Sequence, residues 1–571
     1  MEYIIKINNR DYSNWTVCDK HNNEICLSGF SPITSKLFHN DVFSFSENQE
    51  LTIVDSPLKT THIVAGILLL EGNKTFGSYK NKYYYRCVPH DKTLPIFIVP
   101  YEIKKIGFEK YQKNKYVLFT FYEWIDKHPI GKLVETIGDV DVPENIYEYQ
   151  LQCYNLNVSL SSFNKKANNI LKQNIVNNEM FESFIQTSKY SLQDRRSTYV
   201  FAIDPIGSTD FDDAFSINTN NIGEIVVSVY IANVALWLEY LCLWDELTSR
   251  VSTIYMPDKR RLLLPSILTD QIFTLKHKQD NIAMFVDFTI SSDGNIISDK
   301  VSYGNACINV KKNFVYEEDK LLKNEHYKKL FNITSMLDNT ITESHSLVAY
   351  WMIQTNIYFA GLLKDKNIGI FRSSSLKDEL FAIPKDNMTN EEYNMLKNFK
   401  TINCDYVNVS EDLTHTAMGI DIYIHITSPI RRIVDIYNQL CFQYYYGIIT
   451  ELSNSAISFL ERCCSLTGYI NQQSKYIKKV QNSSNIIHLA LTNKDILSCN
   501  YDVILFDCQK YALGYTYNAY LPYLKIFSKV KTDKLYENYT KTKCQLYYFS
   551  SENQINNKIK IQLSYTVEDV L

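Results

Sequence analysis

Residues 199–217 read YVFAIDPIGSTDFDDAFSI, and this stretch decides the fold class and the chemistry that we expect. An apolar run typical of a buried strand ends at Asp204, a turn of Pro, Gly, Ser and Thr follows, and then come Asp210, Asp212 and Asp213. Four carboxylates within ten residues repel one another unless a cation neutralises them. Hard oxygen ligands suit Mg²⁺, with Mn²⁺ as the alternative, so we expect these four aspartates to hold the metal.

The carboxylate loop alone leaves more than one interpretation open. Two bound ions would activate a water molecule and stabilise the leaving oxygen of a phosphodiester. A solvated acidic turn and a calcium loop are the competing interpretations. An EF-hand does not fit, because the DxDxDG register and the distant Glu are missing. A second motif is needed to decide between these interpretations.

That motif is IHITSPIRRIVDIYNQL at residues 424–440. It predicts a helix over residues 429–446, with Ser428 as N-cap, a proline at the first position, and Arg431 and Arg432 in the first turn. The amino terminus of a helix already carries positive partial charge, so two arginines there indicate a bound anion. Backbone N–H groups and a planar guanidinium together make a cradle for phosphate.

The competing interpretation is that Arg431 merely pairs with Asp435 one turn further along the helix. Taken by itself, the helix favours that structural role. Together with the carboxylate loop, it favours phosphate chemistry.

The bulk composition limits the class of protein. A chain of 571 residues with 45% hydrophobic and 21% charged residues predicts several cores, in roughly three or four domains. The 13 cysteines show no CxxC spacing, so we expect neither disulfides nor zinc. The amino terminus has no apolar signal core, and no stretch is long and apolar enough to span a membrane. These features, together with the cysteines, predict a cytoplasmic or nuclear protein. The net charge of −4 requires that any nucleic-acid site be locally basic.

The order of predicted elements indicates the organisation. Short β-branched and aromatic runs up to about residue 150 predict two small β-barrels, at 1–57 and 58–150. A helical connector at 151–190 leads into an α+β body at 191–495, where strands precede long helices at 344–366 and 429–446. Alternating strands at 500–571, including NKIKIQLSYTV, predict one more small β-barrel.

Several motifs together resemble the RNB family, which includes bacterial ribonuclease II and ribonuclease R and the catalytic subunit of the eukaryotic exosome. AIDPIGSTDFDDAF is similar to the family's metal loop, with all four aspartates in register. HTAMGIDIYIHITSPIRRIVD resembles its arginine signature and carries His415, His425 and Arg431 onto matching positions. The resemblance extends over almost the whole chain.

Further blocks place residues for RNA contact and also show departures from the family. RVSTIYMPDKRRLLLP puts Tyr255 at the RNA-contacting tyrosine, and VKKNFVYEE puts Tyr316 at the tyrosine that stacks on the 3′-terminal base. Asn233, in VYIANV, stands where Asp is usual. Ala349 and Tyr350, in HSLVAYWMIQTN, replace two acidic residues.

The flanking barrels carry a weaker resemblance. FYEWIDKHPIGKLVETIGDV at 121–140 resembles the second cold-shock-like barrel of the eukaryotic enzymes, which favours the eukaryotic-type branch. Since the resemblance begins near residue 1, we expect no PIN endonuclease region. The expected fold is therefore an α+β RNB domain flanked by OB-fold barrels, two cold-shock-like at the amino terminus and one RNA-binding at 500–571.

The resemblance implies a hydrolytic 3′→5′ exoribonuclease of the ribonuclease II type, which degrades single-stranded RNA to nucleoside 5′-monophosphates with two Mg²⁺ or Mn²⁺ ions. Asp210, Asp212 and Arg431 would be catalytic, while His425 and the two tyrosines would bind RNA beside Arg431. We expect a monomer, with an RNA-decay complex as a further partner. The alternative is an RNA-binding regulator with the same fold and little or no catalysis, and hydrolysis of DNA also stays open.

Overall fold

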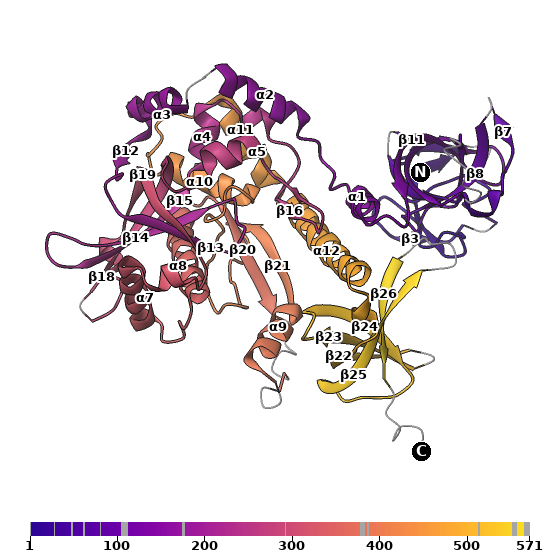
Figure 1. Cartoon of the computed structure of the whole chain (residues 1–571). Coiled ribbons are helices and arrows are strands. Elements are labelled where there is room, and N and C mark those ends of the chain that lie inside the picture. The colour runs from indigo at the N-terminus through magenta and orange to yellow at the C-terminus, as the bar shows by residue number, and fades with distance from the viewer. Residues whose placement is uncertain are drawn as a thin grey trace. The chain divides into compact units, whose positions relative to one another are not determined.

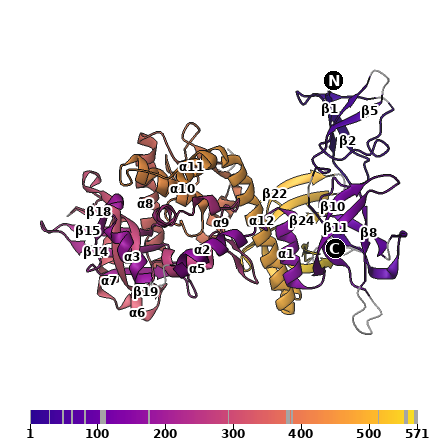
Figure 2. The ribbon, with the colours of Figure 1, turned by 90° about the horizontal axis from the view of Figure 1, so that it is seen from above.

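The computed structural model describes residues 2–27, 29–46, 50–60, 63–79, 82–103, 112–173, 177–291, 293–376, 383–384, 388–511, 514–550 and 557–564. The chain forms two compact units, one made of residues 1–157, 256–258 and 478–571, and the other of residues 158–255 and 259–477. Figures 1 and 2 draw the ribbon from two directions. None of the described helices is both long and apolar enough to cross a membrane.

The first unit contains three β-sheets that share one strand order. Leaving aside the short β7, the first strand of each lies between the second and the fourth, and in the first and third sheets the third and fifth strands lie outermost. The first sheet consists of β1 (Glu2–Ile7), β2 (Trp15–Cys18), β3 (Glu24–Ile25), β4 (Val42–Phe45) and β5 (Leu51–Asp55). The second consists of β6 (Val64–Leu68), β8 (Lys82–Pro89), β9 (Phe97–Tyr101), β10 (Lys115–Glu123) and β11 (Ile130–Asp139), with the short β7 (Ser78–Tyr79) beside β8. The third consists of β22 (Asn500–Tyr511), β23 (Gly514–Leu521), β24 (Ile526–Thr532), β25 (Thr540–Ser550) and β26 (Asn557–Leu563).

The second of these sheets closes into a barrel. Strand β6 pairs with both β10 and β8, and β9 pairs with β11 in parallel through Ile98 and Ile130. Closure removes the unpaired edges that an open sheet would expose. The sheets are OB-like, while their assignment as cold-shock and carboxyl-terminal RNA-binding domains, with the boundaries given above, stays a prediction.

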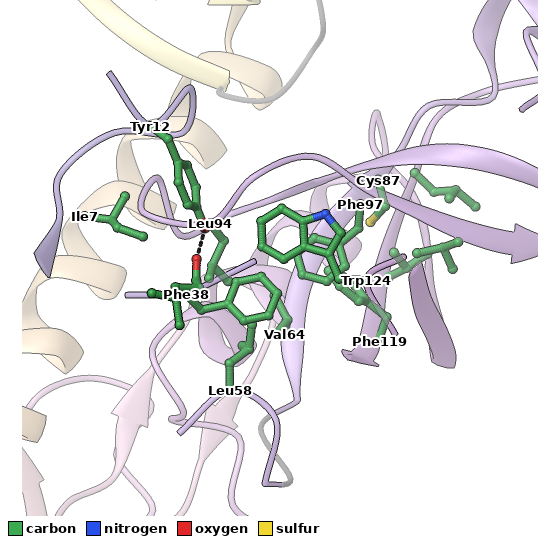
Figure 3. Close-up of a cluster of buried hydrophobic side chains, with 14 of the residues drawn as sticks. Ile7, Tyr12, Phe38, Leu58, Val64, Cys87, Leu94, Phe97, Phe119 and Trp124 are labelled. Atoms are coloured by element: carbon green, nitrogen blue, oxygen red, sulfur yellow. Dashed lines mark hydrogen bonds between the residues drawn. The ribbon is translucent and has the colours of Figure 1, made fainter. Parts of the chain in front are cut away.

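The two amino-terminal sheets share one hydrophobic core (Figure 3). Phe38 lies 4.9 Å from Trp124 and 6.0 Å from Phe97, measured between ring centroids, and so joins the first sheet's chain segment to the second sheet. The hydroxyl of Tyr12 donates a hydrogen bond to the Leu37 carbonyl at 3.0 Å, so this buried polar group is satisfied. The two predicted barrels are therefore packed against each other rather than independent.

The second unit is built on a six-stranded sheet that also closes. The long β19 pairs antiparallel with β18 along residues 302–309 and parallel with β13 along residues 310–315, which joins the two ends of the sheet. Its strands are β12 (Leu192–Asp194), β13 (Val200–Asp204), β14 (Asp213–Thr219), β15 (Ile225–Ala232), β18 (Asp280–Ile290) and β19 (Ser302–Val315). Strand β13 confirms the buried strand predicted to end at Asp204.

Helices surround this sheet (Figure 1). The same unit contains two further sheets of two strands each: β16 (Ile254–Tyr255) with β17 (Arg260–Arg261), and β20 (Ile370–Leu376) with β21 (Thr401–Asn408). Helix α10 packs against α4, α8 and α11. The helices of this unit are α2 (Ser161–Gln173), α3 (Asn177–Gln186), α4 (Val234–Tyr240), α5 (Ser266–Leu268), α6 (Asp319–Leu322), α7 (Glu325–Leu337), α8 (Ser344–Asp365), α9 (Asn390–Lys400), α10 (Ile433–Tyr445) and α11 (Asn454–Ser465), while α1 (Pro143–Cys153) belongs to the first unit and α12 (Thr467–Thr492) runs through both.

The helical predictions meet a mixed outcome. Helix α8 confirms the helix predicted at 344–366, and α2 and α3 lie within the range predicted as a helical connector. The helix predicted over 429–446 is wrong at its start, since α10 begins at Ile433. The strand predicted from NKIKIQLSYTV is β26, and residues 565–567 of that motif lie outside the described residues.

Candidate active site

The candidate site lies where β13 ends and β14 begins. The two strands are antiparallel neighbours, so Asp204 at the end of β13 and Asp213 at the start of β14 come to the same edge of the sheet. The connecting loop carries Asp210 and Asp212 and turns through Gly207, whose φ of 80° suits a residue without Cβ. The other three aspartates all lie near enough to influence the ionisation of Asp204.

Two of these carboxylates have buried oxygens that no side chain satisfies. The Oδ2 atoms of Asp204 and Asp213 are both buried and lack a hydrogen-bond partner among the residues that the structure describes. A buried unpaired carboxylate oxygen is costly unless it binds a cation or a proton. This pair therefore marks the place where a cation would lower the free energy most.

The ionisation of the loop points the same way. Burial, together with Asp213 and Asp212, raises the pKa of Asp204 to about 9. Burial and Asp212 raise the pKa of Asp213 to about 7. Burial raises the pKa of Asp212 to about 6, although Arg431 and a backbone N–H oppose that change. Without a cation, the loop would keep protons near neutral pH that ordinary aspartates release.

Arg431 joins the second sequence motif to the carboxylate loop. Its Nε lies 3.2 Å from Oδ2 of Asp212, and the backbone N–H of Ile430 donates to Oδ1 of the same carboxylate at 3.0 Å. The two segments are more than two hundred residues apart in the chain. The structure therefore brings the carboxylate loop and the arginine segment together.

The geometry around Arg431 differs from the predicted helix start. Residues 429–431 form a turn in which the Arg431 N–H donates to the Ser428 carbonyl at 3.3 Å. Arg432 has extended backbone angles, pairs with Ser252 as an isolated bridge, and directly precedes α10. Ser428 is therefore not the N-cap, and Arg431 lies before the helix rather than in its first turn. The positive partial charge of a helix amino terminus thus gives no reason for an anion at Arg431.

Asp435 explains why the helix starts late. Its fully buried carboxylate accepts the Ser428 N–H at 2.7 Å and forms an ion pair with Arg432, Nε to Oδ2, at 2.8 Å. These contacts draw residues 428–432 into a turn around the first turn of α10 and aim Arg431 away, toward Asp212. The competing interpretation, in which Arg431 pairs with Asp435, is wrong: Arg432 is the partner.

The two predicted RNA-contacting tyrosines both lie beside the aspartates. The Tyr316 N–H donates to the Asp204 carbonyl at 3.1 Å, its ring lies 5.4 Å from that of His345, and burial, Asp213 and Asp204 raise its pKa. Tyr255 is 40% exposed, and its pKa is raised by burial and by Asp210 and Asp212. Their contact with RNA stays a proposal.

The two histidines lie in an aromatic layer behind the arginine turn. His425 Nδ1 is 2.9 Å from the Tyr406 hydroxyl, and burial and the guanidinium of Arg432 hold the pKa of His425 well below its usual value. His415 Nδ1 is 3.3 Å from the Ser374 hydroxyl. Near neutral pH His425 is therefore an uncharged ring packed beside aromatic residues, and its role in RNA binding is not established by this placement.

The departures from the family pattern lie outside the carboxylate cluster. Asn233 is fully buried, caps α4 by accepting the Leu236 N–H at 3.2 Å, and exchanges hydrogen bonds with Asn305 and Gln443 at 2.8 Å and 3.1 Å. Since these amide groups are all paired, Asn233 is a satisfied structural residue. Ala349 and Tyr350 lie within α8, where the ring of Tyr350 meets Trp351 edge-on.

Sequence reasoning missed one strong contact of the site. Arg260 binds Asp210 and Thr209 across the carboxylate loop. Residues 259–261 are all basic in the sequence, but a basic triplet does not show which side chain turns toward the loop. The backbone N–H of Ile430 could not be identified from side-chain chemistry at all.

The residues present fit a divalent cation in part. Asp204 and Asp213 offer unpaired buried oxygens, whereas Asp210 and Asp212 face arginines. Over the described ranges, no three His, Cys, Asp or Glu side chains are already gathered to hold an ion. Mutual repulsion between carboxylates accounts for this, since the cation itself would draw them together.

The chain is similar in sequence to several known proteins. The RNB domain family matches residues 192–330 and 320–446. Ribonuclease R of Chlamydia muridarum is 22% identical over 330 residues, which make up 45% of this chain and 47% of the relative. The probable exosome complex exonuclease RRP44 of Caenorhabditis elegans is 27% identical over 197 residues, 34% of this chain and 19% of that protein.

Two solved structures have similar folds. The apo form of Mycoplasma genitalium RNase R has a TM-score of 0.68 at 16% identity, over 96% of this chain and 98% of that chain. Yeast Ssd1, described as a pseudonuclease, has a TM-score of 0.59 at 15% identity, over 95% of this chain and 80% of that chain. At such low identity, these likenesses establish the fold alone.

Residues 192–446 thus match the RNB domain family. The chain spans about half the length of the Chlamydia muridarum ribonuclease R that it matches. Relatives come from both the bacterial and the eukaryotic branch, so assignment to the eukaryotic-type branch stays a prediction.

A first prediction concerns pH and metal. Because the folded chain raises the pKa values of Asp212, Asp213 and Asp204 to about 6, 7 and 9, it holds protons that the unfolded chain releases, and its stability falls as pH rises through that window. Mg²⁺ would replace those protons. Added Mg²⁺ should therefore raise Tm more near pH 9 than near pH 6, as measured by scanning calorimetry.

In Asp213→Asn the Mg²⁺-induced rise in Tm should be largely lost, because one of the unpaired oxygens is gone. Asp194→Asn is the matched control, since Asp194 pairs with Arg196 outside the loop. An equal Mg²⁺ effect at both pH values, or in both variants, would contradict metal binding by these carboxylates.

A second prediction separates Asp435 from Arg431. Asp435→Asn should destabilise the fold by about 3–5 kcal/mol, because it leaves Arg432 buried without its counter-charge. Arg431→Ala should cost less stability, since the Arg431 side chain is 45% exposed, but should lower turnover more than 10²-fold by analogy with the loss of one oxyanion donor. Tm and single-turnover rates measure the two effects. Equal stability losses with normal turnover in Arg431→Ala would remove Arg431 from the site.

Proposed function

We propose that the chain is a hydrolytic 3′→5′ exoribonuclease that degrades single-stranded RNA to nucleoside 5′-monophosphates. The observation that carries the proposal is the contact of Asp212 with both Arg431 and the Ile430 N–H, beside the unpaired carboxylates of Asp204 and Asp213. A set of carboxylates with an adjacent guanidinium is suited to hold cations and a phosphate at one place. The names of the relatives, ribonuclease R and exosome complex exonuclease, support the same reaction class.

The roles of the residues follow from their surroundings. Asp204 and Asp213 would bind the divalent cations directly, with Asp210 and Asp212 completing the set. Bound ions of this kind activate water and stabilise the leaving oxygen of a phosphodiester. Arg431 lies on the exposed side of Asp212 and would neutralise charge on the scissile phosphate.

Recognition would depend on the backbone and on stacking rather than on base identity. Tyr316, which is tied to Asp204 through its backbone, would stack on the last base, and Tyr255 would contact the chain beside it. His425 would support the phosphate-binding turn from behind. The same arrangement makes single-stranded RNA the proposed partner, with Mg²⁺ or Mn²⁺ as cofactor.

A second candidate function is RNA binding without catalysis. The departures at Asn233, Ala349 and Tyr350 favour it, and yeast Ssd1, whose fold is similar, is itself described as a pseudonuclease. The carboxylate loop argues against it, because all four aspartates are present and clustered. Incubation of the purified chain with 5′-labelled RNA and Mg²⁺, with and without chelator, separates the two functions: bound but intact RNA would favour the regulator.

A third prediction tests the catalytic loop. Asp212→Asn removes the charge that holds Arg431 and one of the carboxylates, so turnover should fall by about 10²-fold or more. Binding of single-stranded RNA should be unchanged or tighter, because a negative charge is removed from an anion-binding site. Asp194→Asn serves as the control for removal of an aspartate charge outside the loop. Single-turnover cleavage and fluorescence anisotropy measure the two properties, and normal turnover in Asp212→Asn would exclude the proposed centre.

A fourth prediction concerns the polarity of degradation. If Tyr316 stacks on a 3′-terminal base, the enzyme needs a free single-stranded 3′ end. RNA with its 3′ end in a stable duplex should resist degradation, whereas the same duplex at the 5′ end should leave shortening from the 3′ side intact. A gel of 5′-labelled substrates shows this directly. Rapid cleavage of circular RNA would indicate an endonuclease instead.

A further inference from the structure

Arg260 holds the loop of aspartates by two contacts. Its Nη1 lies 2.6 Å from Oδ2 of Asp210, and its Nη2 donates to the Thr209 hydroxyl at 2.7 Å. The Asp210 side chain is only 8% exposed, whereas that of Arg260 is 37% exposed. The guanidinium therefore covers an otherwise buried carboxylate from the solvent side.

The hairpin of β16 and β17 fixes where this arginine can reach. Tyr255 and Arg260 are directly opposite one another in the hairpin, so the arginine and the tyrosine proposed to contact RNA come to the loop together. Arg261 is opposite Ile254 instead, and its Nη1 donates to the Lys259 carbonyl at 2.8 Å. Arg260 therefore brings its guanidinium from β17 onto the loop.

The contact uses an oxygen that the proposed metal set needs. A guanidinium and a divalent cation repel each other, so they compete for the negative charge of one carboxylate. Asp212 differs from Asp210 here, because its other oxygen accepts the backbone N–H of Ile430. Arg260 is thus the arginine whose contact a cation at Asp210 would weaken.

We propose that Arg260 is an exchangeable counter-cation of the loop, bound to Asp210 when the loop lacks divalent cations and released to a phosphate of the nucleic acid when those cations bind. Only the release of Arg260 to a phosphate rests on the proposed function. The competition for Asp210 requires no cleavage. A planar guanidinium suits both states, because it matches the fork of a carboxylate and of a phosphate equally well. Tethered in β17, the released group stays beside Tyr255, where the RNA backbone would pass.

The first half is tested by metal binding without RNA. Arg260→Gln removes the competitor for Asp210, so the Kd for Mn²⁺, measured by the electron paramagnetic resonance signal of free Mn²⁺, should fall at least about threefold, the scale expected for a partly exposed ion pair. Arg260→Lys keeps the charge and should lie between wild type and Arg260→Gln. Arg196→Gln is the matched control, because Arg196 pairs with Asp194 at the same 2.6 Å outside the loop.

The second half is tested by the salt dependence of binding to an uncleaved 2′-O-methyl oligonucleotide. With Mg²⁺ present, Arg260→Gln should reduce the slope of log K against log[KCl] by about 0.7, the value for one lost phosphate contact on a single strand. Without Mg²⁺ the slope should be unchanged, since Arg260 then stays on Asp210. Arg196→Gln should leave the slope unchanged under both conditions.

The outcomes distinguish this inference from the function itself. If wild type degrades RNA but Arg260→Gln binds Mn²⁺ like wild type and only lowers Tm, Arg260 is a structural ion pair and the inference is wrong. A slope that falls equally with and without Mg²⁺ would make Arg260 a permanent phosphate contact and would also overturn the exchange. If Mn²⁺ affinity rises as expected while wild type leaves RNA intact, the competition stands and the proposed catalysis fails.

Discussion

The contact between Asp212 and the Ile430–Arg431 turn is the interaction on which the candidate site depends. One carboxylate accepts a backbone N–H and a guanidinium from a segment more than two hundred residues away, and thereby closes the RNB domain around its loop of aspartates. A buried carboxylate tolerates this position because both oxygens are paired. The neighbouring Asp204 and Asp213 lack such partners among the described residues, so the same loop holds both a satisfied and an unsatisfied half.

Neither half would persist without the rigid elements behind it. The closed sheet fixes the ends of β13 and β14, since β19 pairs with strands at both ends of the sheet. In the arginine segment, the buried Asp435 binds Arg432 and the Ser428 N–H. These contacts keep residues 428–432 in a turn, so that α10 does not begin before Ile433. Unfavourable electrostatics at the aspartates is thus sustained by packing and hydrogen bonding elsewhere, as expected of a site prepared for a ligand.

Local chemistry could be predicted from the sequence wherever it depended on residues close together in the chain. The apolar run before Asp204 and the cluster of aspartates after it were enough to predict β13 and a loop of carboxylates. The start of α10 could not be predicted this way, because Ser428 and a proline form a good capping signal, and only the distant bridge to Ser252 and the buried Asp435 override it. The partner of Arg431 was likewise a matter of tertiary contact rather than of helical spacing.

The two arginines at the loop illustrate how burial separates residues of the same type. Arg431 shares its carboxylate with a backbone donor, so its position is determined by the protein whether or not a ligand is present. Arg260 approaches from a short hairpin and holds Asp210 and Thr209 through side-chain contacts, and it carries the charge that we propose to exchange. Within one loop, the arginine on one aspartate can therefore be held permanently while the arginine on another can exchange. The surrounding backbone, and not the side-chain type, decides which arginine can leave.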